Sequence, residues 1–140
     1  MKDYLEIFND SYEQVLGASA QREDFFSDFY TEFITGSDEV GKKFENTDLV
    51  EQARMLKKSL FYLVNFFVNK KSSDYLEGIA HLHSITERNI TPHLYDYWVD
   101  ALVTTVARHH PHFNDDIDLA WRIVVAPGVA FMKFHYERDV

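Results

Sequence analysis

The chain has 140 residues, of which 46% are hydrophobic and 16% aromatic, so it can fill a globular core as one domain over residues 1–140. It contains no cysteine, which excludes disulfides, thiolate metal sites and cysteine nucleophiles. Its formal net charge of −9 disfavours nucleic acid and anionic membranes as partners, and the lack of a signal peptide or a long apolar run predicts a soluble cytoplasmic protein.

Apolar residues recur every three to four positions along the whole chain, which is the spacing of amphipathic helices. A first helix is predicted to end at Gly17, and a second, rich in phenylalanine, is predicted to end at Gly36. Ser37 is a candidate cap for a short helical turn that runs to Phe44.

A long helix follows, and either Thr47 or Asp48 is expected to cap it. Ser73 is expected to cap a further helix that runs to about Ile85. Thr91–Pro92 predicts the start of another helix, because proline is preorganised at a first helical position.

The last predicted helix carries an apolar stripe between Ile117 and Phe134. No segment shows the strict alternation of apolar and polar residues that is typical of a half-buried strand. We therefore predict an all-α fold of six or more helices.

Two histidines, His81 and His83, lie inside the helix that Ser73 caps. The apolar stripe of this helix contains Ile79 and Ala80, and continuing it by three or four residues reaches His83. His81 lies about 200° around the helix from His83 and is expected to face solvent. Periodicity alone leaves two interpretations of His83 open, a core histidine bonded to a carbonyl or a metal ligand.

Several segments, in this order and spacing, resemble a globin over nearly the whole chain. They are "FFSDFYTEF" (25–33), "KKFENTD" (42–48), "QARML" (52–56), "LEGIAHLHS" (76–84), "TPHLYDYW" (91–98) and "AWRIVVAPGVAFM" (120–132). The similarity is greatest to bacterial single-domain globins and to the globin domain of flavohaemoglobins. It implies a globin fold, with six to eight helices around a pocket for haem b and its iron.

The resemblance implies roles for five residues around the haem. His83 would be the proximal ligand, the only protein bond to iron, and its other ring nitrogen is expected to bond the carbonyl near Ile79 or a side chain. Phe44 would pack on the haem and Leu56 would shape the pocket. Ile90 would cover the ring, and Tyr95 matches a tyrosine of the proximal hydrogen-bond network. The glutamate that completes this network in flavohaemoglobins is replaced by Tyr136, with Glu137 one residue away.

On the opposite, distal side of the haem, the resemblance assigns Tyr30 and Gln52 as hydrogen-bond donors to a bound gas. The alternatives are that Tyr30 is a core tyrosine bonded to a helix carbonyl and that Gln52 is a surface residue. The segment before Gln52 is about two residues shorter than in flavohaemoglobins, and a register slip would bring Val50, Ala53 or Met55 inward instead. The sixth ligand of ferric iron is left open between Tyr30 and Lys57.

The predicted function is reversible binding of dioxygen, carbon monoxide or nitric oxide, as in oxygen storage or transport. A nitric oxide dioxygenase or peroxidase that uses an external reductase is an alternative, and a haem-free sensor or interaction module is another. The haem propionates have four candidate partners: His93, Arg54, Lys57 and Arg88. The histidines at 109, 110 and 112 lack tight ligand spacing, and we expect a solvated loop rather than a zinc site.

Overall fold

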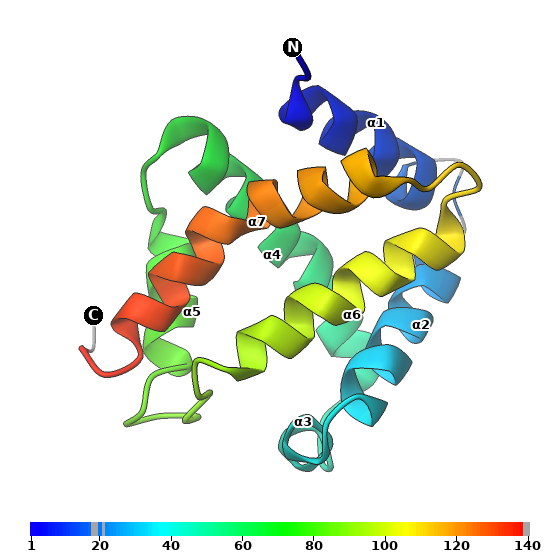
Figure 1. The fold of residues 1–140 in the computed structure, drawn as a ribbon. Helices are drawn as coiled ribbons and strands as arrows, with labels where there is room; N and C mark the ends of the chain where they lie inside the picture. Colours follow the sequence, from blue (N-terminus) through cyan, green and yellow to red (C-terminus); the bar gives the residue numbers. More distant parts are fainter. Residues whose placement is uncertain (18–19, 21, 139–140) are drawn as a thin grey trace.

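A computed structural model of the chain describes residues 1–17, 20 and 22–138. This described part contains seven α-helices and no strand (Figure 1), which confirms the predicted all-α class. In chain order the helices are α1 (Tyr4–Leu16), α2 (Arg22–Thr35), α3 (Asp38–Lys43), α4 (Leu49–Asn69), α5 (Asp74–Leu82), α6 (Leu94–His109) and α7 (Asp115–His135). None of these described helices is long and apolar enough to cross a lipid bilayer.

Most helix ends follow the local signals in the sequence. Gly17 lies directly after α1, as predicted. Asp48, rather than Thr47, caps α4, because its side chain accepts hydrogen bonds from two backbone N–H groups of the first turn. Ser73 caps α5 in the same way. Ser37 occupies the cap position of α3, but its side chain makes no capping hydrogen bond.

Two helix boundaries around His83 differ from the prediction. Helix α5 ends at Leu82 rather than near Ile85, and His83 is its C-cap residue. Helix α6 begins at Leu94, two residues after Pro92, because the preceding residues form a turn closed by short-range backbone hydrogen bonds. The segment that joins α5 to α6 is therefore longer than the sequence indicated.

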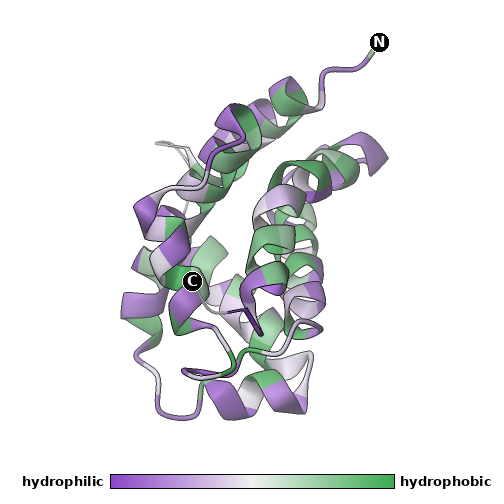
Figure 2. Cartoon of the chain, turned by 90° about the vertical axis from the view of Figure 1, so that its left-hand side faces the viewer, coloured by the Kyte–Doolittle hydropathy of each residue, from purple (hydrophilic) through white to green (hydrophobic). Residues whose placement is uncertain are grey.

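The core lies between crossed helices. Helix α7 packs against α1 and α4, and α2 packs against α6. Hydrophobic and hydrophilic residues share the same helices (Figure 2), as expected when each helix buries one face. Trp121 is fully buried, and its indole N–H donates to Ser11 Oγ at 2.8 Å, while the Ser11 hydroxyl donates to the Phe8 carbonyl at 2.9 Å. The indole donor is thus satisfied inside the core.

Helices α4 and α7 approach each other closely at Gly128. A Cβ atom at this position would lie only 2.0 Å from Leu63 Cδ2. Because Leu63, Val129 and Met132 line the cavity described below, this close crossing shapes one of its walls.

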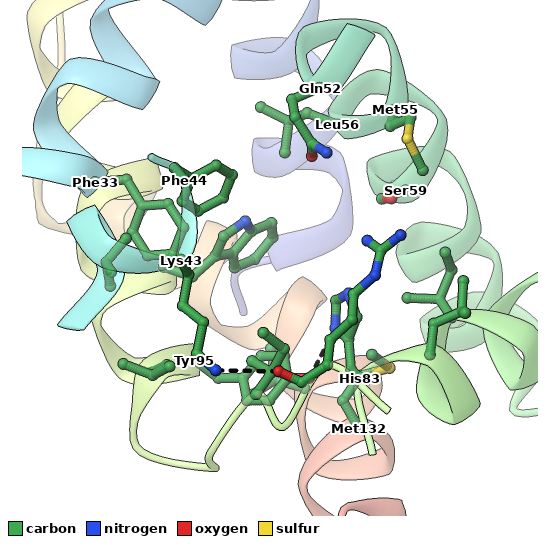
Figure 3. Close-up of a pocket in the computed structure, with 18 of the residues that line it drawn as sticks. Phe33, Lys43, Phe44, Gln52, Met55, Leu56, Ser59, His83, Tyr95 and Met132 are labelled. Atoms are coloured by element: carbon green, nitrogen blue, oxygen red, sulfur yellow. Dashed lines mark hydrogen bonds between the residues drawn. The ribbon is translucent and has the colours of Figure 1, made fainter. Parts of the chain in front are cut away.

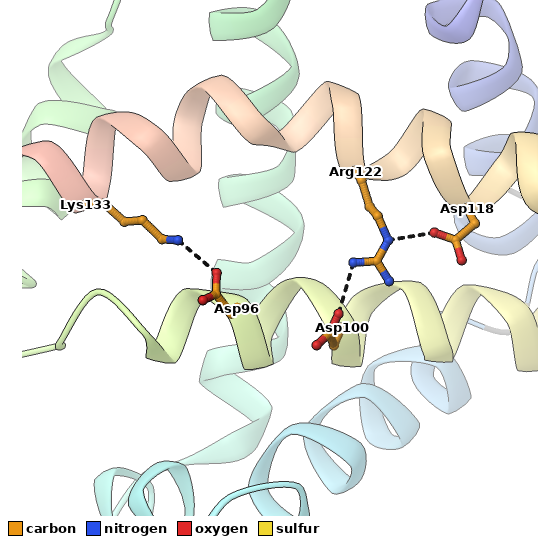
Figure 4. A network of polar contacts seen from close by, with 5 residues as sticks. All are labelled: Asp96, Asp100, Asp118, Arg122 and Lys133. Atoms are coloured by element: carbon orange, nitrogen blue, oxygen red, sulfur yellow. Dashed lines mark hydrogen bonds and ion pairs between the residues drawn. The ribbon is translucent and has the colours of Figure 1, made fainter.

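Ion pairs join α6 to α7 along their exposed faces (Figure 4). Lys133 Nζ lies 2.8 Å from Asp96 Oδ1, and the Arg122 guanidinium contacts Asp100 of α6 at 3.0 Å. Arg122 also pairs with Asp118, one turn away within α7, at 2.6 Å. Exposed pairs of this kind contribute about 0–1 kcal/mol each, so they tune the packing of α6 on α7 rather than create it.

Candidate functional site

A cavity of about 410 Å³ opens between α2, α3 and α4 on one side and α5, α6 and α7 on the other (Figure 3). Its wall is mostly apolar and aromatic, as is typical of a small-molecule site. The seven residues to which the resemblance gave a role at the haem or the bound gas all line it: Tyr30, Phe44, Gln52, Leu56, His83, Ile90 and Tyr95. The structure therefore brings all seven together around one space.

The two histidines of α5 have different surroundings. His83 lines the cavity, whereas His81 does not. The His81 side chain is 42% exposed, and its Nε2 lies 3.5 Å from Glu87 Oε1. This difference agrees with the apolar stripe of α5, which runs toward the cavity and includes His83 at its end.

His83 is held by a side chain rather than by a carbonyl. Its Nδ1 lies 3.0 Å from the Tyr95 hydroxyl, while the Ile79 carbonyl accepts the backbone N–H of His83. No hydrogen bond within the described part of the chain engages Nε2. Burial, with a smaller effect of the Arg88 charge, lowers the His83 pKa to about 4, so the imidazole is neutral at pH 7. A neutral imidazole with one nitrogen fixed can use the other as a metal ligand.

Among the described residues, the side chain bonded to the His83 ring is a phenol and not a carboxylate. Burial raises the pKa of Tyr95, so its hydroxyl is neutral at physiological pH. No Asp or Glu of the described residues lines the cavity. The Tyr136 hydroxyl donates to Asn89 Oδ1, and Glu137 is exposed, so neither replaces the glutamate of the flavohaemoglobin network.

On the other side of the cavity, Tyr30 contacts the first turns of α4. Its hydroxyl donates to the main-chain carbonyl of Gln52 at 2.9 Å, and burial raises its pKa. Tyr30 thus makes the bond expected of a core tyrosine while it also lines the cavity. The Gln52 side chain reaches toward the cavity (Figure 3).

The register of α4 can be compared with the alternatives. Val50 is 82% exposed, and Ala53 is half-buried without lining the cavity. Met55 lines the cavity together with Gln52 and Leu56. Gln52 and Met55 therefore line the cavity together. From the sequence, Met55 was expected there only if a register slip replaced Gln52.

Aromatic rings build the wall next to Tyr30. The Phe44 ring centroid lies 5.9 Å from that of Tyr30 and 5.7 Å from that of Phe33, both in tilted or edge-on arrangements. Such pairs add about 0.5–1.5 kcal/mol beyond the burial of their area. Phe44 is therefore held at the end of α3 with its ring against the cavity.

Two cations line the cavity, and the sequence pointed to one of them. Arg88 lines it, whereas His93, Arg54 and Lys57 do not. His93 lies 3.0 Å from Glu39, and Arg54 pairs with Glu51. Lys57 is thus also removed as a candidate sixth ligand. Lys43 lines the cavity beside Phe44 and was missed.

Other lining residues could have been found from helical spacing. Ser59 and Leu63 continue the face of α4 that carries Leu56, at intervals of three and four residues. Tyr75 gave no such signal, because its position on α5 depends on how α5 packs against α4.

The histidines at the corner between α6 and α7 do not gather into a cluster of metal ligands among the described residues. The described residues contain no group of three or more His, Cys, Asp or Glu that could hold a metal ion. His109 Nε2 lies 2.7 Å from Asp28 Oδ2 and packs edge-on against Phe25, which gives it a role in joining α6 to α2.

Comparisons with known proteins agree with this arrangement. The globin family model matches residues 9–132. A crystal structure of a Pseudomonas aeruginosa PAO1 protein, described as structurally highly homologous to a human hemoglobin, is 30% identical with a TM-score of 0.86. The match covers 96% of this chain and 99% of that one. A search of curated proteins found no significant match. The seven helices have the globin fold, and the chain belongs to the globin family.

Proposed function

We propose that this globin is a haem-b protein that reversibly binds dioxygen or another diatomic gas, such as carbon monoxide or nitric oxide, as a store or carrier. Globins generally bind haem. The observation that carries the proposal is His83, which lines the cavity with Nδ1 engaged by Tyr95 at 3.0 Å. The chain would act as one domain, because the seven helices of its described part contribute to one hydrophobic cluster.

The chemistry of the cavity fits a haem. Phe44, Leu56 and Ile90 offer apolar surface to a flat ring, and Lys43 and Arg88 offer positive charge to carboxylates. When bound, haem supplies an iron atom with one coordination position open to a small gas.

His83 would hold the iron through Nε2. In that tautomer the proton sits on Nδ1 and is donated to the Tyr95 hydroxyl oxygen, which fixes the plane of the imidazole. Because the Tyr95 phenol is neutral, it accepts this proton more weakly than a carboxylate would.

Tyr30 and Gln52 are the donors proposed for the gas. A diatomic ligand that gains partial negative charge is stabilised by a phenol and an amide in a site shielded from water. A hydrogen bond to a charged acceptor contributes about 1.5–3 kcal/mol, and about 1.4 kcal/mol is a tenfold change in an equilibrium constant. The pair therefore supports tight binding of dioxygen and less effect on carbon monoxide.

The proximal side favours a carrier over a peroxidase. No carboxylate of the described residues lines the cavity, so the His83 imidazole gains little of the anionic character that a carboxylate partner would give it. A nitric oxide dioxygenase that uses an external reductase is a second candidate, favoured by two donors that would hold dioxygen tightly. A haem-free interaction module is disfavoured, because polar groups such as Gln52 and His83 would face the cavity without a ligand.

An absorption titration tests the proposal. Haem added to the purified protein should give a strong Soret band that saturates at one haem per chain, and the band of the reduced protein should shift on exposure to carbon monoxide. Failure to take up haem stoichiometrically would leave the globin fold intact and reject the function.

A further inference from the structure

The tyrosines that line the cavity differ in how their hydroxyl groups are held. The Tyr30 hydroxyl donates to the Gln52 carbonyl at 2.9 Å. The Tyr95 hydroxyl lies 3.0 Å from His83 Nδ1. The Tyr75 hydroxyl oxygen is also buried, but it has no hydrogen-bond partner within the described part of the chain. The Tyr75 ring is therefore held by packing alone.

The packing partners of Tyr75 are side chains of α4. Its ring stacks on that of Tyr62, with the centroids 4.4 Å apart and the planes at 18°. The Lys58 ammonium group lies 4.7 Å from the centroid of the Tyr75 ring. Both contacts hold a flat ring by its face, and neither engages the hydroxyl group.

The stacked pair stands between two pockets. Tyr75 lines the cavity, whereas its partner Tyr62 lines a second, more open pocket where α4 is followed by α5. This surface pocket is lined by Tyr62, Asn65, Asn69, Lys71 and Ser73. The cavity and the surface pocket share no lining residue, and the two stacked rings form the partition between them.

The free energy of the closed position is raised by the Tyr75 hydroxyl. A buried hydroxyl without a partner has lost its hydrogen bonds to water and has gained none in return. Rotation of Tyr75 toward the surface pocket would return the hydroxyl to water, at the cost of the contacts with Tyr62 and Lys58. The same rotation of Tyr30 or Tyr95 would break a hydrogen bond. Tyr75 is thus the tyrosine of the cavity wall whose outward rotation is opposed least.

The surroundings of Tyr75 indicate what could pass beside it. Leu63, next to Tyr62 in the chain, and Leu76, next to Tyr75, both line the cavity. A charged molecule would lose its hydration in such a passage, whereas a small uncharged molecule would not pay this cost. Dioxygen, carbon monoxide and nitric oxide belong to the second class.

We propose that Tyr75 is the gate of an opening between α4 and α5, through which an uncharged diatomic gas passes from the surface pocket into the cavity. Outward rotation of Tyr75 opens the partition, and renewed stacking on Tyr62 closes it. The identity of the gas rests on the proposed function. The opening itself is a property of the chain.

Quenching of tryptophan fluorescence by dissolved dioxygen tests the opening without haem. Trp98 lines the cavity, whereas Trp121 is fully buried in the core. Removal of the gate in Tyr75→Ala should raise the quenching rate constant by about twofold or more. Tyr75→Phe should lower it, because the ring remains and no hydroxyl gains from contact with water. Phe134→Ala, which removes an exposed ring that lines neither pocket, is the control and should match the wild type.

The association rate of carbon monoxide tests the route in the haem-loaded protein. After flash photolysis, the bimolecular rate should be about threefold to tenfold higher in Tyr75→Ala than in the wild type. Tyr75→Phe should be slower than the wild type, for the reason given above. Phe134→Ala should again match the wild type.

A plug in the surface pocket tests where the route begins. The chain has no cysteine, so Asn65→Cys offers a single thiol in this pocket for a bulky maleimide. The modified protein should bind carbon monoxide about threefold more slowly than the same variant before modification. Lys57→Cys, at an exposed position of α4 that lines neither pocket, is the control and should not change on modification.

The outcomes separate this inference from the proposed function. Equal dioxygen quenching, or equal carbon monoxide association, in the wild type, Tyr75→Ala and Tyr75→Phe would overturn the gate. An unchanged rate in the modified Asn65→Cys protein would overturn the surface pocket as the outer end of the route. Failure to bind haem would instead reject the proposed function, and the quenching of Trp98 would still decide whether the opening exists.

Discussion

The two sides of the cavity differ in how far hydrogen bonds already fix the side chains that would contact a ligand. On the proximal side, His83 has its Nδ1 engaged by Tyr95, and its carbonyl accepts from Ile90, so its ring and its backbone are both fixed. On the distal side, the single proton of the Tyr30 hydroxyl is already donated to the Gln52 carbonyl. The side proposed to hold iron is therefore already fixed by hydrogen bonds, whereas on the side proposed to bind gas Tyr30 would have to give up its hydrogen bond to the Gln52 carbonyl before it could donate to a ligand.

The largest effect is expected from removing the proximal imidazole. His83→Ala should abolish five-coordinate haem binding, because no other histidine lines the cavity among the described residues. His81→Ala is the matched control and should bind one haem per chain like the wild type. Both are measured by absorption titration with haem. The reverse pattern would mean that the helical register of α5 is wrong.

Tyr95→Phe should have the next largest effect. It removes the hydroxyl that engages His83 Nδ1 and frees the imidazole to rotate. Loss of such an outer partner typically weakens metal affinity by about 10- to 100-fold, and we expect haem dissociation to accelerate within that range. The control is Tyr97→Phe, an exposed neighbour on α6. Identical haem dissociation in both variants would show that the Tyr95 bond does not support the ligand.

On the opposite side of the cavity, Tyr30→Phe removes the hydroxyl proposed to donate to a bound gas. We expect dioxygen to dissociate about tenfold faster or more, and carbon monoxide to change less, because only the more polar ligand gains from a donor. Stopped-flow dissociation of both gases measures this. Tyr12→Phe, which packs against Trp121 away from the cavity, is the control. An unchanged dioxygen dissociation rate would show that Tyr30 does not donate to the bound gas.

A smaller change in the dioxygen dissociation rate is expected when the side-chain amide of Gln52 is removed. Gln52→Leu removes the amide donor but keeps the main-chain carbonyl that Tyr30 uses. Dioxygen dissociation should therefore accelerate by several-fold, less than in Tyr30→Phe, while the contact between α2 and α4 is retained. If dioxygen dissociated faster from Gln52→Leu than from Tyr30→Phe, the Gln52 amide would be the main donor.

The smallest expected effect is on the stability of the apoprotein at acidic pH. Burial lowers the His83 pKa to about 4, whereas the unfolded chain has a histidine pKa near about 6.5. Between these values the unfolded state binds more protons, so the free energy of unfolding should fall as the pH drops from 6.5 toward 4. Urea unfolding at pH 7 and pH 5 should show a smaller loss in His83→Gln, by on the order of 1 kcal/mol. Equal losses in both proteins would indicate that His83 is not buried in the apoprotein.

The helices were predictable because they depend on neighbours in the sequence. The apolar stripe of α5 separated His83 from His81, and capping residues such as Asp48 and Ser73 gave the helix starts. The predicted end of α5 was about three residues too late, since His83 closes the helix. The loop that follows is held by a hydrogen bond from the Ile85 N–H to the carbonyl of Tyr136, the residue directly after α7.

The contacts of the site could not be predicted in the same way. The Tyr30 acceptor is a main-chain oxygen on another helix, and a carbonyl carries no signal in the sequence. Lys43 resembles any exposed lysine until the loop around Asn89 is placed beside it. The Tyr95 contact was one of two alternatives for His83, and the choice depends on how α6 packs against the end of α5.

The role of His83 is tested most directly by the resonance Raman spectrum of the reduced, gas-free protein loaded with haem. We expect five-coordinate iron with an iron–histidine stretching band, which is kept in His81→Ala and lost in His83→Ala. A six-coordinate spectrum in the wild type, or a band that persists in His83→Ala, would contradict the assignment of His83 as the proximal ligand.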